Sequence, residues 1–416
     1  MSLAEIIDPI RALWNNVEFW KFLSIPVVAG LVGWSTNWAA IQLTFYPLRF
    51  LGIPPYLGWQ GIIPSKARKM AGIFVDSTMS RLGTLPELFE KMEPERIAEQ
   101  VNRVILPRMD RYTDEALFAE TPEIWSSTPE VVRRQVYKRV REELPALVEN
   151  LLEEARGQVD ELIDFKDMIT TRLEEDPALL NRLIRDSGEE EFRFIIRSGL
   201  YFGFLFGIVQ LVVWYFYRGA WVLPTFGLLV GYATNWIALN VIFRPLYPMK
   251  VGPWTFQGLF LQRQQEVARV WCRLVTREIV TVRAIVHAML YGPCAEKTQA
   301  LIRKHIEPLV REAAGPLDLP AQLTLGPATM EALRERVGDK AQDVSGDPFD
   351  DWHFNRDRSR IVERLLRERM EALSPEEFQD LLRPCFQEDE LKLILIGAAL
   401  GFGAGLLQFL FVFGGG

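Results

Sequence analysis

Cysteine and histidine are scarce in this chain of 416 residues, and each occurs only three times. An odd and sparse set of cysteines argues against a disulfide framework and fits a reducing compartment. The three histidines form no recognisable nucleophile–base arrangement, and the sequence lacks a glycine-rich loop of the kind that cradles phosphate. We therefore expect no catalytic residues, no metal site and no cofactor, and we interpret the protein as not being an enzyme.

An excess of positive charge is also lacking. The formal net charge at pH 7 is −7, which does not favour a nucleic-acid partner. Hydrophobic residues make up 49% of the chain but are unevenly distributed. Four runs reach the roughly 20 apolar residues that cross a bilayer, and they cover 19–45, 194–217, 221–243 and 391–413. The remainder is rich in Glu, Arg and Leu and predicts soluble helices.

An octapeptide pattern occurs twice, once in the first apolar run and once in the third. It reads Gly-Trp-Ser-Thr-Asn-Trp-Ala-Ala from Gly33 and Gly-Tyr-Ala-Thr-Asn-Trp-Ile-Ala from Gly231, a displacement of 198 positions. The same displacement relates Pro47 to Pro245 near the start of each half. Matches in the middle and at the end of each half extend the pattern, so we predict a tandem duplication with its join near Arg218.

Each half then consists of a span, a soluble helical region and a second span. After an N-terminal tail (1–18) come repeat 1 (19–217, soluble region 46–193), a hairpin (218–220) and repeat 2 (221–416, soluble region 244–390). Two spans return the chain to its starting side, so both halves share one orientation. The predicted fold class is an all-α membrane protein with four transmembrane helices in two parallel repeats and two helical soluble regions on one face of the membrane.

A long apolar stripe marks the first soluble region. Its residues recur at helical spacing: Val132, Val136, Val140, Leu144, Leu147 and Leu151. Thr128 as N-cap and Pro129 at the first helical position predict one helix that runs to about Asp164, with a kink at Pro145. Long helices with narrow apolar stripes usually pair with each other or with another subunit, so self-association is one expectation.

Shorter helices are predicted near the end of each soluble region. Residues 361–373 form a counterpart of the long stripe, and Ser374 opens a capping box before the next helix. Its partner in the first half starts at Asp176. No alternation is long enough to predict a sheet.

A polar pair interrupts each copy of the octapeptide, namely Thr36-Asn37 and Thr234-Asn235. Polar side chains are costly in lipid, so the pairs should have a purpose. One interpretation is hydrogen bonding between helices that joins the two halves. The other is a polar patch that lines a path for a lipid headgroup or a small solute. Neither span contains an acidic residue, which weakens any proton-coupled or ion-coupled mechanism.

Glycines four residues apart, followed by a glutamine, mark the second and fourth spans. Such ladders, together with Gly33 and Gly231, predict a flat groove for a partner helix. The ladder residues are Gly199, Gly203, Gly207 and Gln210 in the second span and Gly397, Gly401, Gly405 and Gln408 in the fourth.

The segments after the first and third spans are rich in aromatic and aliphatic residues bounded by positive charges. We predict that each is an interfacial loop leading into an amphipathic helix. It could simply anchor the chain in the headgroup layer or form a lipid-contacting rim. The rim residues are Trp59, Gln60, Gly61, Arg244, Pro245, Gln257 and Gly258.

Residues 340–355 interrupt the second soluble region and predict a loop. Asp347, Asp350, Asp351 and His353 lie in it, but their spacing matches no metal-binding loop, so we expect a solvated acidic segment.

The order of these motifs resembles a bacterial family of membrane proteins that includes YheB-like and YjiN-like proteins. The resemblance covers nearly all of the chain and is close from Gly231 to Pro245, whereas the first half has Tyr46 where the family favours arginine. It implies two fused units and a location in the bacterial inner membrane. It implies no particular activity.

Positive residues near the span ends are more numerous on the soluble side than on the other side, which favours cytoplasmic soluble regions. Our leading hypothesis is a non-enzymatic inner-membrane protein that organises the envelope or carries lipid or another apolar cargo, with membrane lipid as its partner. One alternative is a small-solute channel or transporter with the Thr–Asn pairs in its membrane path. Another is an oligomeric membrane scaffold.

Overall fold

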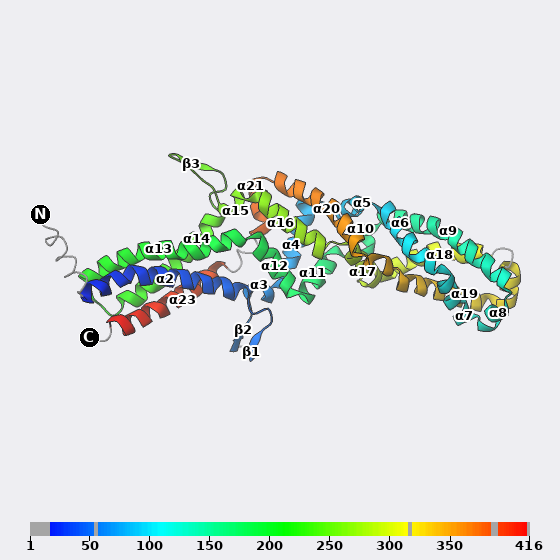
Figure 1. The fold of residues 1–416 in the computed structure, drawn as a ribbon, viewed down its shortest axis with the longest axis horizontal. Coiled ribbons are helices and arrows are strands. Elements are labelled where there is room, and N and C mark those ends of the chain that lie inside the picture. The colour runs from blue at the N-terminus through cyan, green and yellow to red at the C-terminus, as the bar shows by residue number, and fades with distance from the viewer. Residues whose placement is uncertain (1–16, 54–56, 315–317, 384–389, 414–416) are drawn as a thin grey trace, which may run out of the picture. The chain divides into compact units, whose positions relative to one another are not determined.

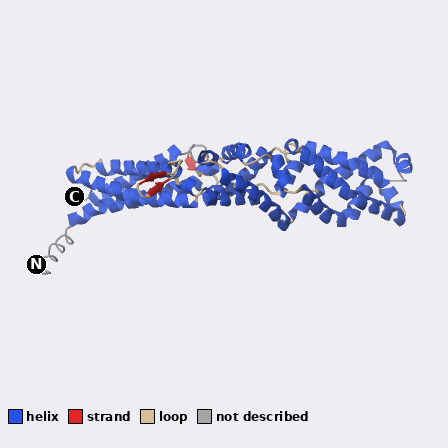
Figure 2. Ribbon diagram, turned by 90° about the horizontal axis from the view of Figure 1, so that it is seen from above, coloured by secondary structure: helices blue, strands red, loops and turns tan. Residues whose placement is uncertain are grey.

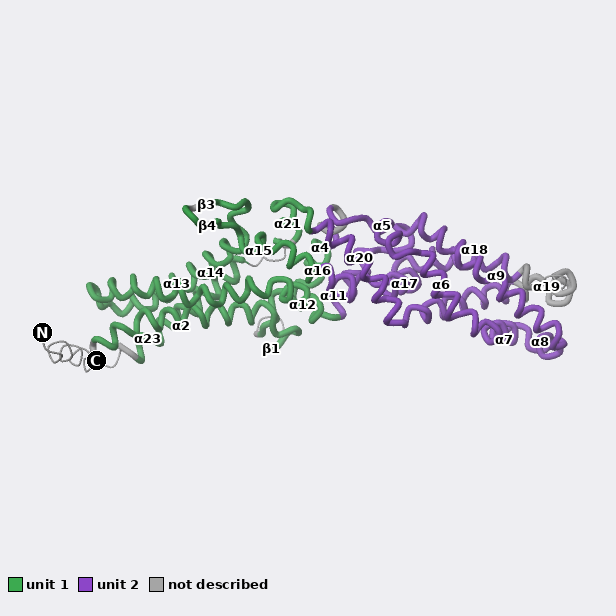
Figure 3. Tube along the Cα trace, turned by 45° about the horizontal axis from the view of Figure 1, so that its top comes forward, with its two compact units in different colours: residues 1–74, 176–271, 371–416 green, residues 75–175, 272–370 purple. Residues whose placement is uncertain are grey.

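Helices make up almost all of the regular structure in the computed structural model (Figures 1 and 2), in agreement with the predicted all-α class. Residues 17–53, 57–314, 318–383 and 390–413 are described. The chain divides into two compact units (Figure 3). Unit 1 comprises Met1–Phe74, Asp176–Trp271 and Glu371–Gly416, and unit 2 comprises Val75–Glu175 and Cys272–Met370. Each unit therefore combines segments from both halves of the sequence.

Unit 1 contains four long apolar helices, each long and apolar enough to cross a membrane. They are α2 (Val17–Phe45), α13 (Glu189–Phe216), α14 (Val222–Phe243) and α23 (Glu390–Gln408), which continues as a π-helical turn at Phe409–Phe413. Helix α2 packs along α13 and α14 packs along α23, and the two pairs contact each other (Figure 1). Helix α13 begins five residues before its predicted span, because the acidic run at Glu189 extends the helix beyond the apolar segment.

Short β-hairpins stand where the sequence predicts interfacial loops, so the expectation of no strands is wrong for these two segments. Strand β1 (Leu51–Ile53) pairs with β2 (Leu57–Trp59), and β3 (Met249–Val251) pairs with β4 (Trp254–Phe256), both antiparallel. Three residues per strand are too few for a recognisable alternation. At the turn of the second hairpin Gly252 has φ of +63°, a conformation that glycine adopts without steric cost.

The remaining elements of unit 1 follow the hairpins and precede the spans. Helices α3 (Ile62–Ser65) and α15 (Leu259–Gln262) come directly after the hairpins, followed by α4 (Ala67–Arg81) and α16 (Gln264–Glu278), which continue into unit 2. Helices α12 (Pro177–Ser187) and α21 (Pro375–Leu382) complete the unit. Their predicted N-caps are confirmed, since Asp176 accepts a hydrogen bond from Leu179 N and Ser374 forms a full capping box with Glu377.

Unit 2 is entirely helical in the part that the structure describes. From the first half it takes α5 (Leu85–Lys91), α6 (Pro94–Ile105), α7 (Met109–Glu120), α8 (Pro122–Ser127), α9 (Glu130–Gly157), α10 (Val159–Leu162) and α11 (Phe165–Glu175). From the second half it takes α17 (Val282–Tyr291), α18 (Ala295–Ala314), α19 (Asp318–Val344) and α20 (Trp352–Ala372). Short 3₁₀ turns lie at Leu106–Arg108 and Asp347–Asp350.

The long predicted helix is correct in its centre and wrong at both ends. Helix α9 starts at Glu130, with Pro129 in the N-cap position. The Thr128 hydroxyl donates to the carbonyl of Ile124 instead of capping α9 (2.7 Å). Helix α9 ends at Gly157, where the weakest helix former of the stretch other than proline interrupts the pattern, and the remaining residues form the separate helix α10.

The predicted loop at 340–355 is also mostly helical. Helix α19 continues to Val344, and α20 begins at Trp352. The side chain of Asp351 accepts hydrogen bonds from the backbone N–H of His353 (2.9 Å) and Phe354 (3.2 Å), so it stabilises the start of α20. The predicted helix over 361–373 is therefore present, but it starts nine residues earlier than predicted, since the first residues of α20 carry few aliphatic side chains.

Candidate functional site

A cavity of about 360 Å³ lies inside unit 2. Helix α9 forms one side of it, and all six residues of the predicted apolar stripe line the cavity. The stripe is therefore turned inward within the unit. Helices α6 and α7 from the first half and α17, α18 and α19 from the second half supply the other walls.

The walls are almost entirely apolar. Buried Leu301 and Ile306 of α18 and Leu333 of α19 face the cavity together with Ile105 of α6. A few polar side chains also belong to the lining, and among them Thr298 has a buried hydroxyl with no hydrogen-bond partner among the described residues. Lys340, which also lines the cavity, pairs with Glu115 of α7. A largely hydrophobic space of this kind suits an apolar guest.

Polar contacts connect the cavity-lining helices to one another. The carboxylate of Glu154 on α9 contacts two residues of α18, Lys304 (2.5 Å) and His305 (2.8 Å). Hydrogen bonds from Lys304 and then from His305 hold the pKa of Glu154 below its usual range. Arg141 of α9 pairs with Asp110 of α7 (3.1 Å). Such partly exposed pairs add little stability individually, but they tie α9 to both neighbours.

Aromatic residues and one carboxylate meet near α8. Asp114 accepts hydrogen bonds from the indole N–H of Trp125 (2.9 Å) and from the hydroxyl of Tyr137. Burial and then this hydrogen bond raise the pKa of Tyr137 to about 12. Trp125, which lines the cavity, is thus fixed by a partner on α7.

The acidic segment near η3 (Asp347–Asp350) has basic partners. Asp347 pairs with Arg108 (3.0 Å), and Asp351 lies 3.4 Å from Arg103. Asp350 pairs with Arg283 (3.2 Å). These aspartates are therefore not simply solvated, because their ion pairs connect the segment before α20 to neighbouring helices. Within the described residues, no group of three or more His, Cys, Asp or Glu side chains could hold a metal ion.

In unit 1 the asparagine of each Thr–Asn pair bonds to a neighbouring helix. Asn37 Nδ2 donates to the carbonyl of Ile195 on α13 (2.7 Å), and Asn235 Nδ2 donates to the carbonyl of Leu393 on α23 (3.0 Å). Both bonds span 158 residues of sequence and connect the two spans of one half, not the two halves. The prediction that these asparagines form hydrogen bonds between helices is therefore correct, but the prediction that the bonds join the two halves is wrong.

The threonines of the two pairs turn back onto their own helices. Thr36 Oγ1 donates to the carbonyl of Gly33 (3.2 Å), and Thr234 Oγ1 donates to that of Val230 (2.8 Å). Both threonines are buried. Their hydroxyl protons are therefore used locally, and in the first pair the buried Oδ1 of Asn37 has no hydrogen-bond partner among the described residues.

The glycine ladders lie where the backbones of the spans touch. A Cβ on Gly401 would meet the carbonyl oxygen of Gly227 at 2.2 Å, and one on Gly199 would meet that of Gly33 at 2.3 Å. A Cβ on Gly203 or Gly405 would also meet a carbonyl oxygen, at 2.5 or 2.4 Å. One on Gly207 would meet the Cα of Pro26 at 2.6 Å, and one on Gly397 would meet Asn235 Nδ2 at 2.1 Å. The predicted groove is thus filled by a partner helix. Gln210 and Gln408 are buried, but the amide nitrogen of Gln408 has no partner among the described residues.

The Gln-Gly motif of the rim closes the base of each hairpin. Gln60 Nε2 donates to the carbonyl of Leu48 (2.9 Å), and Gln257 Nε2 donates to that of Leu246 (3.0 Å). The glycines that follow lie against the ends of the spans, since a Cβ on Gly61 or Gly258 would come within 2.8 Å of backbone atoms of α2 or α14.

The hairpins themselves carry exposed apolar side chains. Leu51 and Ile53 are 66% and 71% exposed, and Met249 and Phe256 are 56% and 45% exposed. Trp59 is partly exposed and donates to the carbonyl of Leu43 (3.2 Å). The two hairpins project from opposite sides of unit 1 (Figure 1). Apolar groups on so short an element fit the headgroup region of a membrane.

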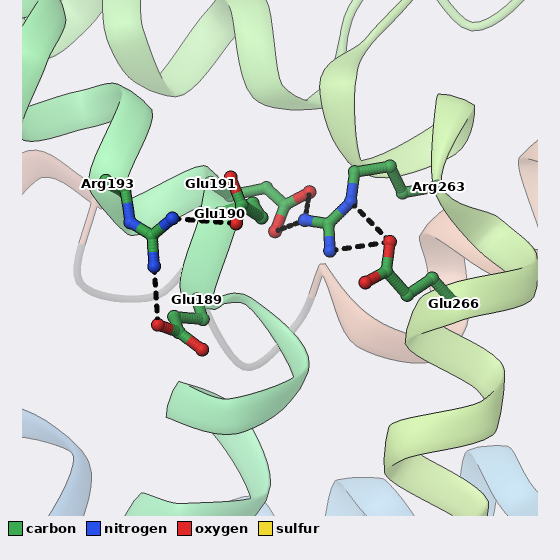
Figure 4. A network of polar contacts seen from close by, with 6 residues as sticks. All are labelled: Glu189, Glu190, Glu191, Arg193, Arg263 and Glu266. Carbon is green, nitrogen blue, oxygen red and sulfur yellow. Dashed lines mark hydrogen bonds and ion pairs between the residues drawn. The ribbon is translucent and has the colours of Figure 1, made fainter.

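A charged pair crosses between the halves inside unit 1 (Figure 4). Both carboxylate oxygens of Glu191 lie 3.0 Å from Arg263 Nη1, and Arg263 also contacts Glu266 (2.9 Å). The side chain of Glu191 is only 4% exposed. This pair could not be predicted from the sequence, because 72 residues separate its members and no local pattern links them.

A small void adjoins this pair between the apolar helices. It measures about 30 Å³ and is lined by Ala40, Thr44, Glu191 and Asn235 among others. That volume holds about one water molecule.

The chain matches no protein-family model, no curated protein and no solved structure.

Proposed function

We propose that the protein is a non-enzymatic membrane protein that holds the alkyl chain of a lipid in the cavity of unit 2. The observation that carries this proposal is the apolar stripe of α9 facing a 360 Å³ space inside the unit. Ligand pockets usually measure about 300–1,000 Å³, so the cavity is large enough for a small ligand or part of a lipid chain. Each methylene transferred from water contributes about 0.8 kcal/mol, which favours a long alkyl chain over a compact solute.

The channel alternative has less support. The Asn37 and Asn235 amides donate to backbone carbonyls, and the void that Asn235 lines holds about one water. The scaffold alternative rests on the α9 stripe as a docking face, and that stripe lines the cavity. We therefore favour lipid carriage or storage among our three hypotheses.

We further propose two parallel repeats in the bacterial inner membrane, with the soluble regions on the cytoplasmic face. The matched hydrogen bonds of Asn37 and Asn235 support the duplication, and the motif resemblance supports the location. Labelling of Cys294 in intact cells with a membrane-impermeant maleimide tests sidedness. Protection in cells, with labelling after denaturation, supports the cytoplasmic face, whereas efficient labelling in cells contradicts it.

Gentle extraction followed by native mass spectrometry tests the cavity. We expect the wild-type chain to retain a lipid or fatty acid and to bind a fluorescent fatty acid after delipidation. The variant Val140→Phe fills the cavity from buried Val140 and should lose most of this binding while its melting temperature stays the same or rises.

Val131 provides the matched control on the same helix, because it is 78% exposed and does not line the cavity. Val131→Phe should bind the fluorescent fatty acid like the wild type. Equal binding by Val140→Phe and the wild type, or no binding by either, contradicts the proposal.

A further inference from the structure

The apolar helices α2 and α14 end in the same way in both halves. The backbone N–H of Tyr46 donates to the carbonyl of Gln42, and that of Arg244 donates to the carbonyl of Asn240, both at 2.8 Å. Each residue directly follows its helix and precedes a proline. Positions 46 and 244 therefore occupy the same place relative to their helices.

A buried amide holds the last carbonyl of each helix. Asn181 Nδ2 on α12 donates to the carbonyl of Phe45 (2.6 Å). Gln379 on α21, with its amide oriented to satisfy both neighbours, donates to the carbonyl of Phe243 (3.0 Å). Asn181 and Gln379 are both buried. The same displacement of 198 positions relates them, so α12 and α21 dock in matching positions.

The two places differ in charge. In the first half Arg185 Nη1 donates to the hydroxyl of Tyr46 (3.0 Å), so the guanidinium group of Arg185 has a phenol as its hydrogen-bond partner. In the second half Arg383 stands at the position of Arg185, and its Nη1 donates to the oxygen of Gln379 (3.0 Å). Arg244 replaces the tyrosine. Among the described residues neither Arg244 nor Arg383 forms an ion pair.

Both arginines line one open depression of about 460 Å³ in unit 1. Its other lining residues include Asn240, Pro245 and Gln379, and no acidic side chain belongs to the lining. Two guanidinium groups beside a shared space repel each other unless an anion lies between them. The depression therefore has the charge of an anion site, held in shape by a buried amide.

We propose that this depression binds a phosphate group. Arginine matches phosphate oxygens with paired N–H donors, and two arginines supply several such donors. The depression also lies directly after α14, which is long and apolar enough to cross a membrane. If α14 spans a bilayer as proposed above, the end of this helix lies near the lipid phosphates. The phosphate belongs either to a phospholipid headgroup or to a soluble phosphate compound.

Native mass spectrometry of the full chain in detergent, titrated with phosphatidylglycerol, tests the site. Arg244→Tyr restores the residue found in the first half and should bind one phosphatidylglycerol fewer than the wild type. Tyr46→Arg should bind one more, because Arg185 would then face a second guanidinium. Diacylglycerol, which lacks the phosphate, should bind equally to all three proteins.

Inorganic phosphate forms the second arm. If it raises the melting temperature of the wild type but not of Arg244→Tyr, while phosphatidylglycerol binding is equal, the site takes soluble phosphate. If neither ligand distinguishes the variants, the phosphate site does not exist. Adding Val140→Phe should not change the difference in phosphatidylglycerol binding between Arg244→Tyr and the protein with Arg244. Failure of the cavity proposal and failure of the phosphate proposal therefore give different results.

Discussion

The two units use apolar residues in opposite ways. In unit 1 glycines bring helix backbones into contact, and the void near the ends of its apolar helices is about 30 Å³. In unit 2 valines, leucines and isoleucines face one another across about 360 Å³. Long helices with apolar stripes occur in both units, so the stripe alone does not distinguish a packed interface from a cavity. The size of the side chains at the facing positions does.

This difference indicates where a guest molecule can bind. A space the size of one water leaves no room for a solute, and enlarging it would separate helices that are joined by backbone contacts and by the amides of Asn37 and Asn235. The cavity of unit 2 needs no such rearrangement. We therefore predict that enlarging a side chain is destructive where helix backbones touch in unit 1 and is tolerated at the cavity of unit 2.

The largest effect should follow Gly401→Leu or Gly203→Leu. A Cβ at either position would lie 2.2–2.5 Å from a backbone oxygen, and backbone cannot move aside as a side chain can. We expect a loss of about 3 kcal/mol or more in the stability of the helix bundle, measured by thermal unfolding in detergent. Val140→Phe in unit 2 should instead leave the melting temperature unchanged or raise it.

Gly403 is the matched control, because it lies on the same helix α23 and a Cβ there would meet nothing within 4 Å. Gly403→Leu should unfold like the wild type. If Gly401→Leu and Gly403→Leu have equal stability, the close-packed description of unit 1 is wrong.

A second effect, of up to about 3 kcal/mol, should follow removal of one member of the Glu191–Arg263 pair. Glu191→Leu leaves the guanidinium partly buried without this carboxylate, and Arg263→Leu leaves a buried carboxylate without its partner. The double variant should recover much of the stability, because neither charge remains. Chemical unfolding of the three variants measures the coupling. Additive losses would contradict a direct role of the pair.

Much of unit 1 could be predicted from the sequence because its signals are local. Spans follow from run length, and the positions of Gly199 and Asn37 follow from repetition. The partner of Asn37 could not be predicted, since a pattern along one helix does not identify the helix opposite. The pair of Glu191 and Arg263 lacks even a local pattern.

Unit 2 was harder to predict for a different reason. The stripe from Val132 to Leu151 is recognisable in the sequence, but periodicity indicates which face of a helix is apolar and not what that face contacts. The cavity depends on several helices that come from both halves of the chain. Short elements such as β1 and β2 were missed because three residues cannot display a period.

A third and smaller effect concerns the two amides. Asn37→Leu and Asn235→Leu each remove one interhelical hydrogen bond in an apolar setting, which should cost about 1 kcal/mol. The two losses should be similar, because the bonds correspond. Ser35→Ala is the control, since its hydroxyl bonds only to its own helix. Thermal unfolding gives the stabilities, and fluorescent fatty-acid binding should be unchanged. Loss of binding with normal stability would return the pairs to a functional role.

The smallest effect is a pH dependence of the protein's stability that comes from Glu154, on one of the helices that line the cavity. Lys304 and His305 lower the pKa of Glu154, so the folded state binds its proton less readily than the unfolded chain, whose glutamate pKa is about 4.3. The stabilisation is therefore present above that pH and is lost as pH falls through the lower folded value. The melting temperature of the wild type should exceed that of Glu154→Gln at pH 6, and the difference should shrink below about pH 4. Glu149→Gln, at an exposed position of the same helix, should show no such change. A difference between Glu154→Gln and the wild type that stays constant down to pH 3 would mean that the ion pairs of Glu154 do not hold α9 to α18.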